Sequence, residues 1–589
     1  MAIVVNLNKC ENTILFSHGK KVDIADVVKI TNIDEKSIKF LKELENQVFE
    51  DGSISKLYIY DGLEMYSFYR ATIYEKLKEF MTRVITLEEI IKFIIDNEVE
   101  GDNKLGESNE IEIVTDDIII YDLGKNLFSI KNIILNEEYV VEEDTENKFK
   151  ISNSYHLLKR ALKGLKHFTV HKFKYNKEKL LLCTQVSAIN TITINNISYE
   201  YDALYGKIKD QLEKEYNVFN LQVLNSKDII IKANGLGKNY FPFEYIRVYR
   251  KMFGKMLINK EKIVDNLDDL KFFNFYYGDY DLKGFITKYV FNNLEHFYMN
   301  YVEEILVFKR LMKSLKIKKV LAVDEADRPR CMIVAGNLLG IETFGIQHGL
   351  INETSVAYLV PSNEKKLVPK TTFLWGTKFK ELLTNNTEVF TEENIAVIGQ
   401  PRTDYLYEKN LVDKDEYRKE EKNHKRILFA TQPIKDLSED SFIMLCEALK
   451  GSNNYELIVK LHPSDSNLHF YEKNINEYKL NNVEITKEKD LYDCLIWCDM
   501  VISVHSTVIL EGAILDKPSI CILLPKYYDE GNFVKEELSL GAKSSDELLE
   551  CINKINAAGK GNYKSFIERN FYKVDGKVSE RAIKIINDK

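Results

Sequence analysis

Histidine and hydroxyl side chains end two apolar runs in the second half of the 589-residue chain. Ser506 and Thr507 follow the run VISVH and open an apolar helical stretch, where free backbone N–H groups and the helix dipole attract an anion. His462 ends the run IVKL, and its imidazole can donate to a phosphate oxygen. Ser506 also suits a simple helix N-cap and His462 a simple turn. Together they predict a phosphate site at one edge of a sheet.

A third apolar run, IETFGI, ends in Gln347, His348 and Gly349. Gly349 permits a sharp turn, which would leave His348 at the end of the strand. An imidazole titrates near neutrality, so His348 is a candidate general base for an acceptor hydroxyl. A hydrogen-bonded structural histidine is the alternative.

Charged residues follow the run KKVLAV. Asp324 or Glu325 would orient His348 or act as the base itself, and Arg328 and Arg330 are candidates for anion binding. A solvated loop explains the same charges. Arg402, in the turn IGQPRTD, is a further candidate for anion binding, although we interpret that turn mainly as a structural hinge.

The sequence contains few motifs that bind metal ions. The chain has no GxxxxGK[ST] motif, and no DxD pair lies in a strand-end context. Cys494 and Cys498 are four residues apart, but no nearby Cys/His pair completes a zinc site, so we interpret them as core thiols. We expect no metal and no cofactor beyond a nucleotide-activated substrate.

The elements that must position these residues alternate between strand and helix from about residue 175 onward. This order is typical of βαβ units with parallel sheets, which bind ligands at the carboxyl ends of their strands. We predict an α/β fold with two Rossmann-like domains facing a cleft, at 175–410 and 424–575, followed by a C-terminal helix at 576–589. Residues 1–165 are predicted to form an α/β or α+β accessory domain of unknown role, with EIEIV and DIIIYDLG as β-rich runs.

Composition excludes several classes of protein. The net charge of −9 disfavours nucleic acid as a partner. The start of the chain lacks a signal-peptide pattern, and no long apolar window suggests a membrane span. We therefore expect a cytoplasmic protein. The basic amphipathic segment 247–262 either contacts anionic lipid at the inner face of the membrane or is a solvated helix face.

The order IQHG, IGQPRTD, KLHP and SVHSTVILEGAILDKP resembles transferases of the GT-B type that assemble bacterial surface polymers, over about residues 318–525. These include the CDP-glycerol glycerophosphotransferases of teichoic acid synthesis and the capsule enzymes that transfer Kdo or sialic acid from CMP-activated donors. The resemblance does not extend to residues 1–165.

The resemblance implies a metal-independent transferase that moves a sugar or polyol phosphate from a CMP- or CDP-activated donor to a glycan or lipid-linked acceptor. It implies His348 as base and His462, Ser506 and Thr507 as ligands of the donor phosphate. It places Thr431 and Gln432 beside the nucleotide and Glu511 in contact with the donor. His505 stands where such motifs have a small residue, which leaves the register of the phosphate loop open by one position.

Two other functions remain open from the sequence. A UDP-sugar 2-epimerase shares the two-domain architecture and a histidine-and-hydroxyl phosphate site. A non-catalytic protein that binds nucleotide or glycan would keep the fold and lose turnover. Substitution of His348 distinguishes the non-catalytic binding protein from an enzyme, because only an enzyme would lose turnover.

Overall fold

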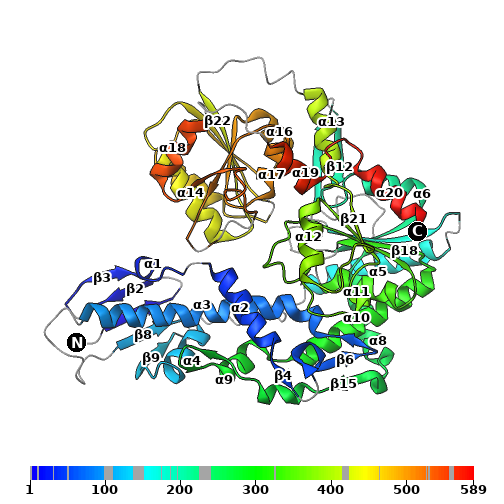
Figure 1. The fold of residues 1–589 in the computed structure, drawn as a ribbon, viewed down its shortest axis with the longest axis horizontal. Coiled ribbons are helices and arrows are strands. Elements are labelled where there is room, and N and C mark those ends of the chain that lie inside the picture. The colour runs from blue at the N-terminus through cyan, green and yellow to red at the C-terminus, as the bar shows by residue number, and fades with distance from the viewer. Residues whose placement is uncertain are drawn as a thin grey trace.

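The computed structural model describes residues 3–589 except positions 9–11, 17, 31, 50–51, 99–110, 137–151, 174–175, 186–187, 195–196, 224–240, 324–326, 414–423, 463, 526, 528–530 and 556–562. Three sheets of five or more strands organise this part of the chain (Figure 1). We refer to them as the N-terminal region, the first α/β unit and the second α/β unit.

The N-terminal region contains a mixed five-stranded sheet in the order β3-β2-β1-β8-β9. Its strands are β1 (Ile3–Leu7), β2 (Asn12–Leu15), β3 (Lys21–Asp23), β8 (Ile111–Thr115) and β9 (Asn132–Leu135). Its helices are α1 (Ile24–Val27), α2 (Ile33–Glu45), α3 (Tyr66–Glu98) and α4 (Ile118–Asn126). The short strands β4 (Val48–Phe49), β5 (Gly52–Ser53), β6 (Tyr58–Tyr60) and β7 (Leu63–Glu64) lie between α2 and α3.

One β-rich run of this region is a helix instead. EIEIV contributes β8 as predicted, but the prediction of a strand for DIIIYDLG is wrong, because these residues begin α4. Asp117 caps the helix by accepting from the backbone N–H groups of Ile119 at 2.8 Å and Ile120 at 3.2 Å. The capping carboxylate outweighs the β propensity of three consecutive isoleucines.

The first α/β unit contains a parallel seven-stranded sheet in the order β14-β13-β10-β18-β19-β20-β21. Its strands are β10 (Lys179–Gln185), β13 (Asn217–Val223), β14 (Phe241–Pro242), β18 (Lys319–Val323), β19 (Glu342–Ile346), β20 (Thr371–Leu374) and β21 (Ile395–Val397). The main helices are α5 (Ser152–Lys172), α6 (Lys207–Glu215), α8 (Glu244–Leu257), α10 (Leu294–Leu315), α11 (Asp327–Asn337) and α12 (Thr377–Asn386). A hairpin, β11 (Ile189–Ile194) and β12 (Ile197–Asp202), follows β10.

The second α/β unit contains a parallel six-stranded sheet in the order β24-β23-β22-β25-β26-β27. Its strands are β22 (Lys425–Ala430), β23 (Tyr455–Lys460), β24 (Val483–Thr486), β25 (Met500–Ser503), β26 (Ser519–Ile522) and β27 (Leu540–Ala542). The helices are α14 (Lys435–Leu449), α15 (Leu468–Glu477), α16 (Leu491–Trp497), α17 (Thr507–Ile514), α18 (Ser545–Ile555) and α19 (Lys564–Phe571). Helix α13 (Thr403–Asp413) precedes this unit, and α20 (Val578–Asp588) follows it.

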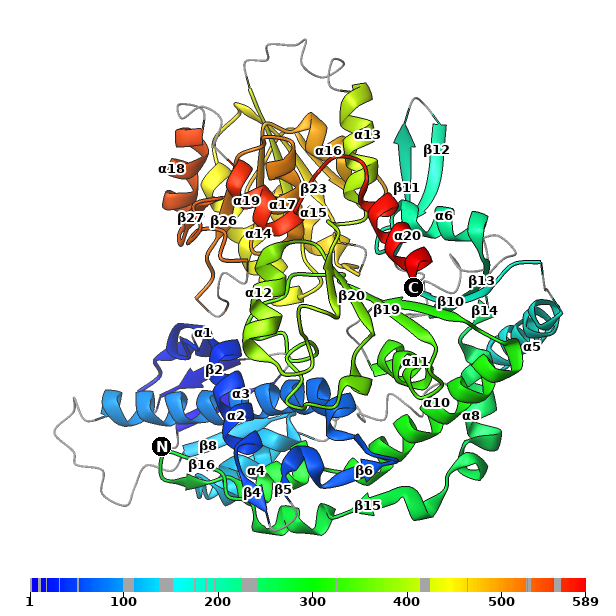
Figure 2. The same ribbon diagram turned by 45° about the vertical axis from the view of Figure 1, so that its right-hand side comes forward.

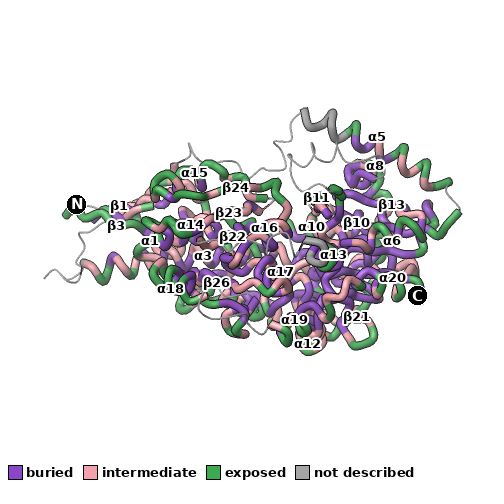
Figure 3. Tube along the Cα trace, turned by 90° about the horizontal axis from the view of Figure 1, so that it is seen from above, coloured by how far each residue is buried: buried purple, intermediate pink, exposed green. Residues whose placement is uncertain are grey.

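The α/β fold class predicted from strand–helix alternation is confirmed, with two parallel sheets after an N-terminal α/β region. Central strands such as β18 and β25 are buried at every position, as expected for parallel strands covered by helices on both faces. In Figure 3 strands of the two parallel sheets, such as β10, β22 and β23, lie in the buried interior, whereas α5 lies at the periphery.

The N-terminal region and the first α/β unit share one hydrophobic core. Leu77 of α3 belongs to the same buried cluster as Phe308 of α10 and Ile351. In addition, β15 (Ile263–Asp265) pairs antiparallel with β6, with Ile263 opposite Tyr60. The predicted division near residue 165 thus separates two sheets that share one core. Sequence could not show this pairing because its partners are about 200 residues apart.

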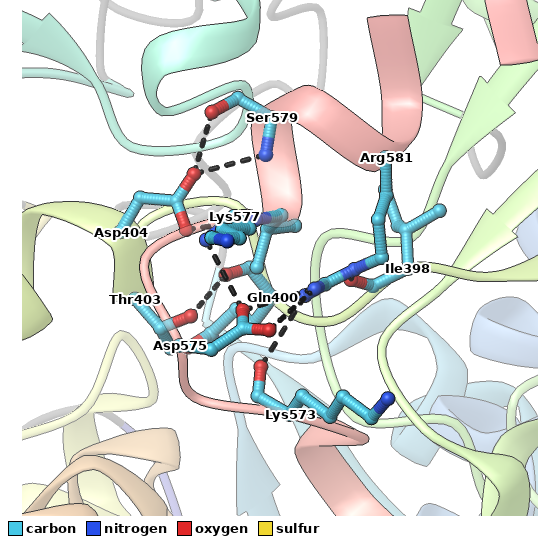
Figure 4. Close-up of polar contacts among 10 residues, drawn as sticks. Ile398, Gln400, Thr403, Asp404, Lys573, Asp575, Lys577, Ser579 and Arg581 are labelled. Carbon is cyan, nitrogen blue, oxygen red and sulfur yellow. Dashed lines mark hydrogen bonds and ion pairs between the residues drawn. The ribbon is translucent and has the colours of Figure 1, made fainter. Parts of the chain in front are cut away.

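The C-terminal helix α20 returns to the first α/β unit and packs on α6 (Figure 2). Asp404 is buried and accepts from the backbone N–H groups of Val578 and Ser579, both at 2.9 Å, and from Ser579 Oγ at 2.6 Å (Figure 4). Arg581 Nε donates to the carbonyl of Ile398 at 2.8 Å. Gly399 has φ +100°, and a Cβ there would meet Val578 Cγ2 at 2.9 Å. The turn IGQPRTD therefore anchors α20.

Candidate functional site

The candidate site of the second α/β unit lies where its strand order reverses. The chain enters at β22, continues outward on one side to β23 and β24, and then resumes on the other side at β25. The carboxyl ends of β22 and β25 therefore diverge into separate turns, which is where doubly wound sheets bind ligands. Ser503 Oγ donates to the carbonyl of Ala430 at 2.8 Å and joins the two strand ends. Thr431, Gln432, His505 and Ser506 follow at this point.

Gln432 holds the turn that begins α17. With its amide assigned from its hydrogen-bond neighbours, its side-chain oxygen accepts from the backbone N–H groups of His505 at 2.9 Å and Ser506 at 3.0 Å. Its side-chain nitrogen donates to His505 Nε2 at 3.0 Å. Ser506 is the N-cap and accepts from Val508 N–H at 3.3 Å, so Thr507 is the first helical residue. The register left open by His505 is thereby fixed.

Thr431 positions the turn that contains His462. Its buried hydroxyl accepts from the backbone N–H of His462 at 2.8 Å. His462 Nδ1 accepts from Ser464 N–H at 3.1 Å, which leaves Nε2 to carry the proton of the neutral ring. Burial lowers the pKa of His462, against an opposing effect of Asp465. The imidazole is therefore a neutral donor at pH 7, ready to bond a phosphate oxygen through Nε2.

His505, which the sequence marks only as a departure from the motif, forms part of the candidate site. It is 8% exposed, and burial lowers its pKa to about 4. Lys78 of α3 lowers the pKa further and Asp34 of α2 raises it, which indicates that the N-terminal region lies close to this turn. Its ring also lies 6.4 Å from that of Tyr527, edge to face. The neutral imidazole thus completes the framework of the turn that begins α17.

We expect the fold to lose stability in mild acid through His505. Because the folded-state pKa is lowered, the neutral ring stabilises the fold above the unfolded pKa near 6.5, and this contribution is lost as the pH falls toward 4. Between pH 7 and pH 5 the loss is about 2 kcal/mol. Urea denaturation of wild type and His505→Asn at both pH values measures it. An equal loss in both proteins would contradict the assignment.

The turn after β19 holds His348 in a rigid frame. Gln347 is fully buried, and its Nε2 donates to the carbonyl of Gly349 at 2.7 Å, across His348. The backbone N–H of Trp375 donates to Gln347 Oε1 and its indole N–H to the Gln347 carbonyl, both at 2.9 Å. His348 itself is half-buried. Gln347 and Trp375 are therefore supporting residues whose contact, 28 residues apart in sequence, no local motif reveals.

This turn lies against the second α/β unit. Leu350, two residues after His348, packs against the buried cluster that contains Val508 and Ile509 of α17. The first and second α/β units therefore meet beside His348 and the helix that Ser506 caps. The predicted roles of His348 as a base and of the Ser506 turn as a phosphate site remain predictions.

Arg402 links the two units at the same place. Its Nη2 donates to Thr507 Oγ1 at 3.0 Å, and its guanidinium forms an ion pair with Glu511, which is fully buried. Burial raises the pKa of Glu511, and the Arg402 charge opposes that rise. Arg402 and Glu511 thus have a structural partnership in addition to their predicted roles in binding an anion and the donor.

The remaining candidates follow β18 in the sequence. Asp324 and Glu325 lie outside the described residues, directly after β18. The guanidinium of Arg328 lies 4.8 Å from the centre of the Phe243 ring. Arg330 is buried and donates to the backbone carbonyls of Ser67, at 2.6 Å, and Ala357. These contacts give Arg330 a role within the protein, so its predicted contact with an anion remains only a prediction.

Cys494 and Cys498 are buried, and burial raises the pKa of each thiol to about 12. Within the part of the chain that the structure describes, no three His, Cys, Asp or Glu residues are grouped so that they could hold a metal ion. In the same part, none of the helices combines the length and apolar character needed to cross a bilayer.

Solved structures resemble the chain in fold. The UDP co-structure of MnaA from Staphylococcus aureus has a TM-score of 0.43 and 12% identity, over 70% of this chain and 96% of that chain. The UDP-GlcNAc 2-epimerase of Neisseria meningitidis bound to UDP-GlcNAc has the same TM-score and identity, over 70% of this chain and 100% of that chain.

Among curated proteins, the teichoic acid ribitol-phosphate polymerase TarL of Staphylococcus aureus is 26% identical over 218 residues, which is 33% of this chain and 37% of the relative. The teichoic acid poly(ribitol-phosphate) polymerase of Bacillus spizizenii is 28% identical over 222 residues, 32% of this chain and 33% of the relative. The chain therefore matches about a third of the length of each of these relatives.

A family model described as CDP-glycerol:poly(glycerophosphate) glycerophosphotransferase matches residues 376–588. The match contains Arg402, Thr431, Gln432, His462 and the Ser506 turn, and it begins after His348. The predicted resemblance to transferases of surface-polymer assembly is confirmed for this part of the chain. Residues 376–588, which include the turns described above, are thus similar to the CDP-glycerol:poly(glycerophosphate) glycerophosphotransferase family.

Proposed function

We propose that the protein transfers a polyol phosphate from a CDP-activated polyol to a growing bacterial surface glycan. The observation that carries the proposal is the phosphate turn at the strand reversal of the second α/β unit, built from Gln432, His505 and Ser506 within the family match. Similarity to polymerases named for ribitol phosphate supports a polyol donor. A CMP-activated sugar donor would release the same nucleotide, CMP, and is the alternative donor.

In the proposed reaction, an acceptor hydroxyl attacks the phosphorus that bears the polyol. The new O–P bond forms as the bond from that phosphorus to the CMP oxygen breaks, and CMP leaves with the electron pair. His348 Nε2 or Nδ1 takes the hydroxyl proton. The charge on the departing CMP phosphate is stabilised by His462 Nε2–H, the Ser506 and Thr507 hydroxyls and the N-terminus of α17.

We further propose that the two α/β units form a GT-B arrangement with the substrates between them and that no metal ion takes part. The packing of Leu350 on the cluster beneath α17 supports this arrangement. The neutral donors at His462 and at the helix N-terminus suit a phosphate held by protein dipoles. Turnover in excess EDTA tests the metal-free part of the proposal, and restoration by Mg²⁺ or Mn²⁺ would contradict it.

A thermal-shift series tests the nucleotide specificity. CMP, CDP, UMP, UDP, GDP and ADP are compared without added metal, since a ligand that prefers the native state raises the melting temperature. The proposal expects selective stabilisation by CMP and CDP. Stabilisation by UDP alone would instead favour a UDP-sugar transferase or a 2-epimerase. A stable complex with cytidine nucleotides but no turnover with any donor would favour a non-catalytic binding protein.

The acceptor is proposed to be a glycan or lipid-linked polymer reached at the inner face of the membrane. Helices α5 and α8 pack side by side at the periphery (Figure 2), and a Cβ at Gly164 of α5 would meet Tyr245 of α8 at 2.6 Å. Both helices expose apolar side chains: Leu158, Leu162, Leu165, Val170, Met252, Phe253 and Met256. Exposed Lys159, Lys166, Lys251 and Lys255 are interleaved with them. This composition suits an anionic lipid surface.

We expect Lys251→Glu/Lys255→Glu to weaken binding to phosphatidylglycerol vesicles by at least about 30-fold, because each cation near an anionic surface contributes about 1 kcal/mol and the new carboxylates are repelled by the lipid. Co-sedimentation at physiological salt measures the effect, with phosphatidylcholine vesicles as the reference. Lys473→Glu/Lys554→Glu, a reversal of two exposed lysines in the second α/β unit, is the matched control. Equal losses in the two double variants would contradict a lipid surface at α8.

A further inference from the structure

The loop of residues 350–360 continues directly from the His348 turn and is ordered by its own contacts. Asn352 Oδ1 accepts from the backbone N–H of Thr354 at 3.0 Å and from Ser355 Oγ at 3.1 Å. Ile351, Val356 and Tyr358 are buried in the core shared with the N-terminal region. Because the loop continues from the His348 turn without a break, contacts that hold the loop restrict the turn in addition to Gln347 and Trp375.

Arg70 of α3 holds the loop from the N-terminal region. Its side chain is 6% exposed, and its Nη1 donates to the carbonyl of Val356 at 2.7 Å. Its Nε and Nη2 donate to the two oxygens of Glu45, at 2.6 Å and 3.0 Å. This bidentate pair fixes the plane of the guanidinium and so directs the third bond at the loop.

Arg330 holds the next carbonyl of the same loop from the opposite side of the interface. It projects from α11 of the first α/β unit, is buried, and donates to the carbonyl of Ala357. Its Nη1 donates to the carbonyl of Ser67 in the first turn of α3, at 2.6 Å. Two buried guanidiniums, from residues 260 positions apart in sequence, thus donate to consecutive carbonyls of the loop. Both connect the loop to the first part of α3, which contains Arg70 and Ser67.

We infer that Arg70 and Arg330 are positioning residues for His348, and that the N-terminal region acts in the transfer reaction by setting the place of this turn. The expected effect on kcat rests on the proposed function, whereas the positioning of the turn does not. Two fixed donors on neighbouring carbonyls restrict the loop far more than apolar packing alone, because hydrogen bonds are directional. A displacement of the base by about 1 Å lowers the rate of a positioned reaction by about 100-fold.

Three arginine-to-lysine variants test the inference. Lysine keeps the charge but cannot make a bidentate pair and a third directed bond together. Arg70→Lys and Arg330→Lys are expected to lower kcat about 10–100-fold with the dissociation constant for CDP unchanged within about twofold. Arg83→Lys is the matched control, since Arg83 lies on the same helix and pairs at 2.6 Å with Asp117, away from the loop.

Fluorescence quenching gives a readout that does not depend on activity. In a Trp497→Phe background, Trp375 reports on the turn because its indole bonds to Gln347. Acrylamide should quench Trp375 more strongly in the Arg70 and Arg330 variants than in Arg83→Lys. If the wild-type protein shows no transferase activity but both variants show increased quenching, the proposed function is wrong and the positioning of the His348 turn by Arg70 and Arg330 is still supported. Quenching equal to the control, with kcat lowered only in proportion to the folded fraction, would overturn the inference.

Discussion

His348→Ala is expected to lower kcat by about 10²–10⁴-fold, the usual contribution of a positioned general base, while CDP binding stays within about twofold of wild type. In the proposed reaction the base acts on the acceptor hydroxyl, whereas the second α/β unit would hold the nucleotide. Steady-state CMP release measures kcat, and calorimetric titration measures CDP binding. Because Gln347 and Trp375 fix the backbone on both sides of His348, removal of the imidazole should leave the turn intact.

His469→Ala is the control for this substitution, since His469 is an exposed histidine of α15. If His348→Ala retains more than about a tenth of wild-type turnover, His348 is not the base. Asp324→Asn and Glu325→Gln then become the next variants, because these two carboxylates follow β18 at the strand reversal of the first α/β unit.

His462→Ala is expected to weaken CDP binding by about 10–100-fold, because a hydrogen bond to a charged group contributes about 1.5–3 kcal/mol. The same variant should lower kcat, since the charge on the CMP phosphate grows as the bond to phosphorus breaks. Titration of CDP and CMP release measure the two effects. His462 is proposed to contact the phosphates of CDP and not the nucleoside, so the affinity for cytidine itself should change little.

His424→Ala is the matched control for His462→Ala. His424 lies at the amino end of β22, where its Nε2 bonds to Glu456 at 2.6 Å, and it is half-buried like His462. A residue at that end of a parallel sheet lies far from the ligand edge. Equal weakening of CDP binding in both variants would show that the effect comes from general damage to the sheet.

Much of the candidate site in the second α/β unit could be predicted from sequence because each of its turns directly follows a strand. The runs before Thr431, His462 and Ser506 are strongly apolar, so both the strand and the point at which it ends are visible. The parallel order then brings the turns to one edge. The outcome that Ser506 caps α17 follows from the same local pattern.

The supporting contacts could not be predicted in this way. Gln432 bonds to His505 and Ser506 from 73 positions away, and Arg70 reaches Val356 across 286 positions. Such pairs depend on how sheets and helices pack, which a single sequence does not display. The run DIIIYDLG was predicted wrongly for a local reason. The capping carboxylate of Asp117 outweighs the preference of the isoleucines for a strand. The placement of the N-terminal region against the His348 loop belongs to the same class of long-range information.

Polyol-phosphate transfer is tested most directly by measuring CMP release from CDP-glycerol and CDP-ribitol in the presence of a teichoic acid primer. The polyol phosphate that is incorporated into the polymer is quantified in the same reaction. We expect equal amounts of CMP and incorporated polyol phosphate with at least one of the two donors, and loss of both products in His348→Ala and His462→Ala. Epimerisation of UDP-GlcNAc without consumption of either CDP-polyol, or release of CMP without any transfer to the primer, would refute polyol-phosphate transfer.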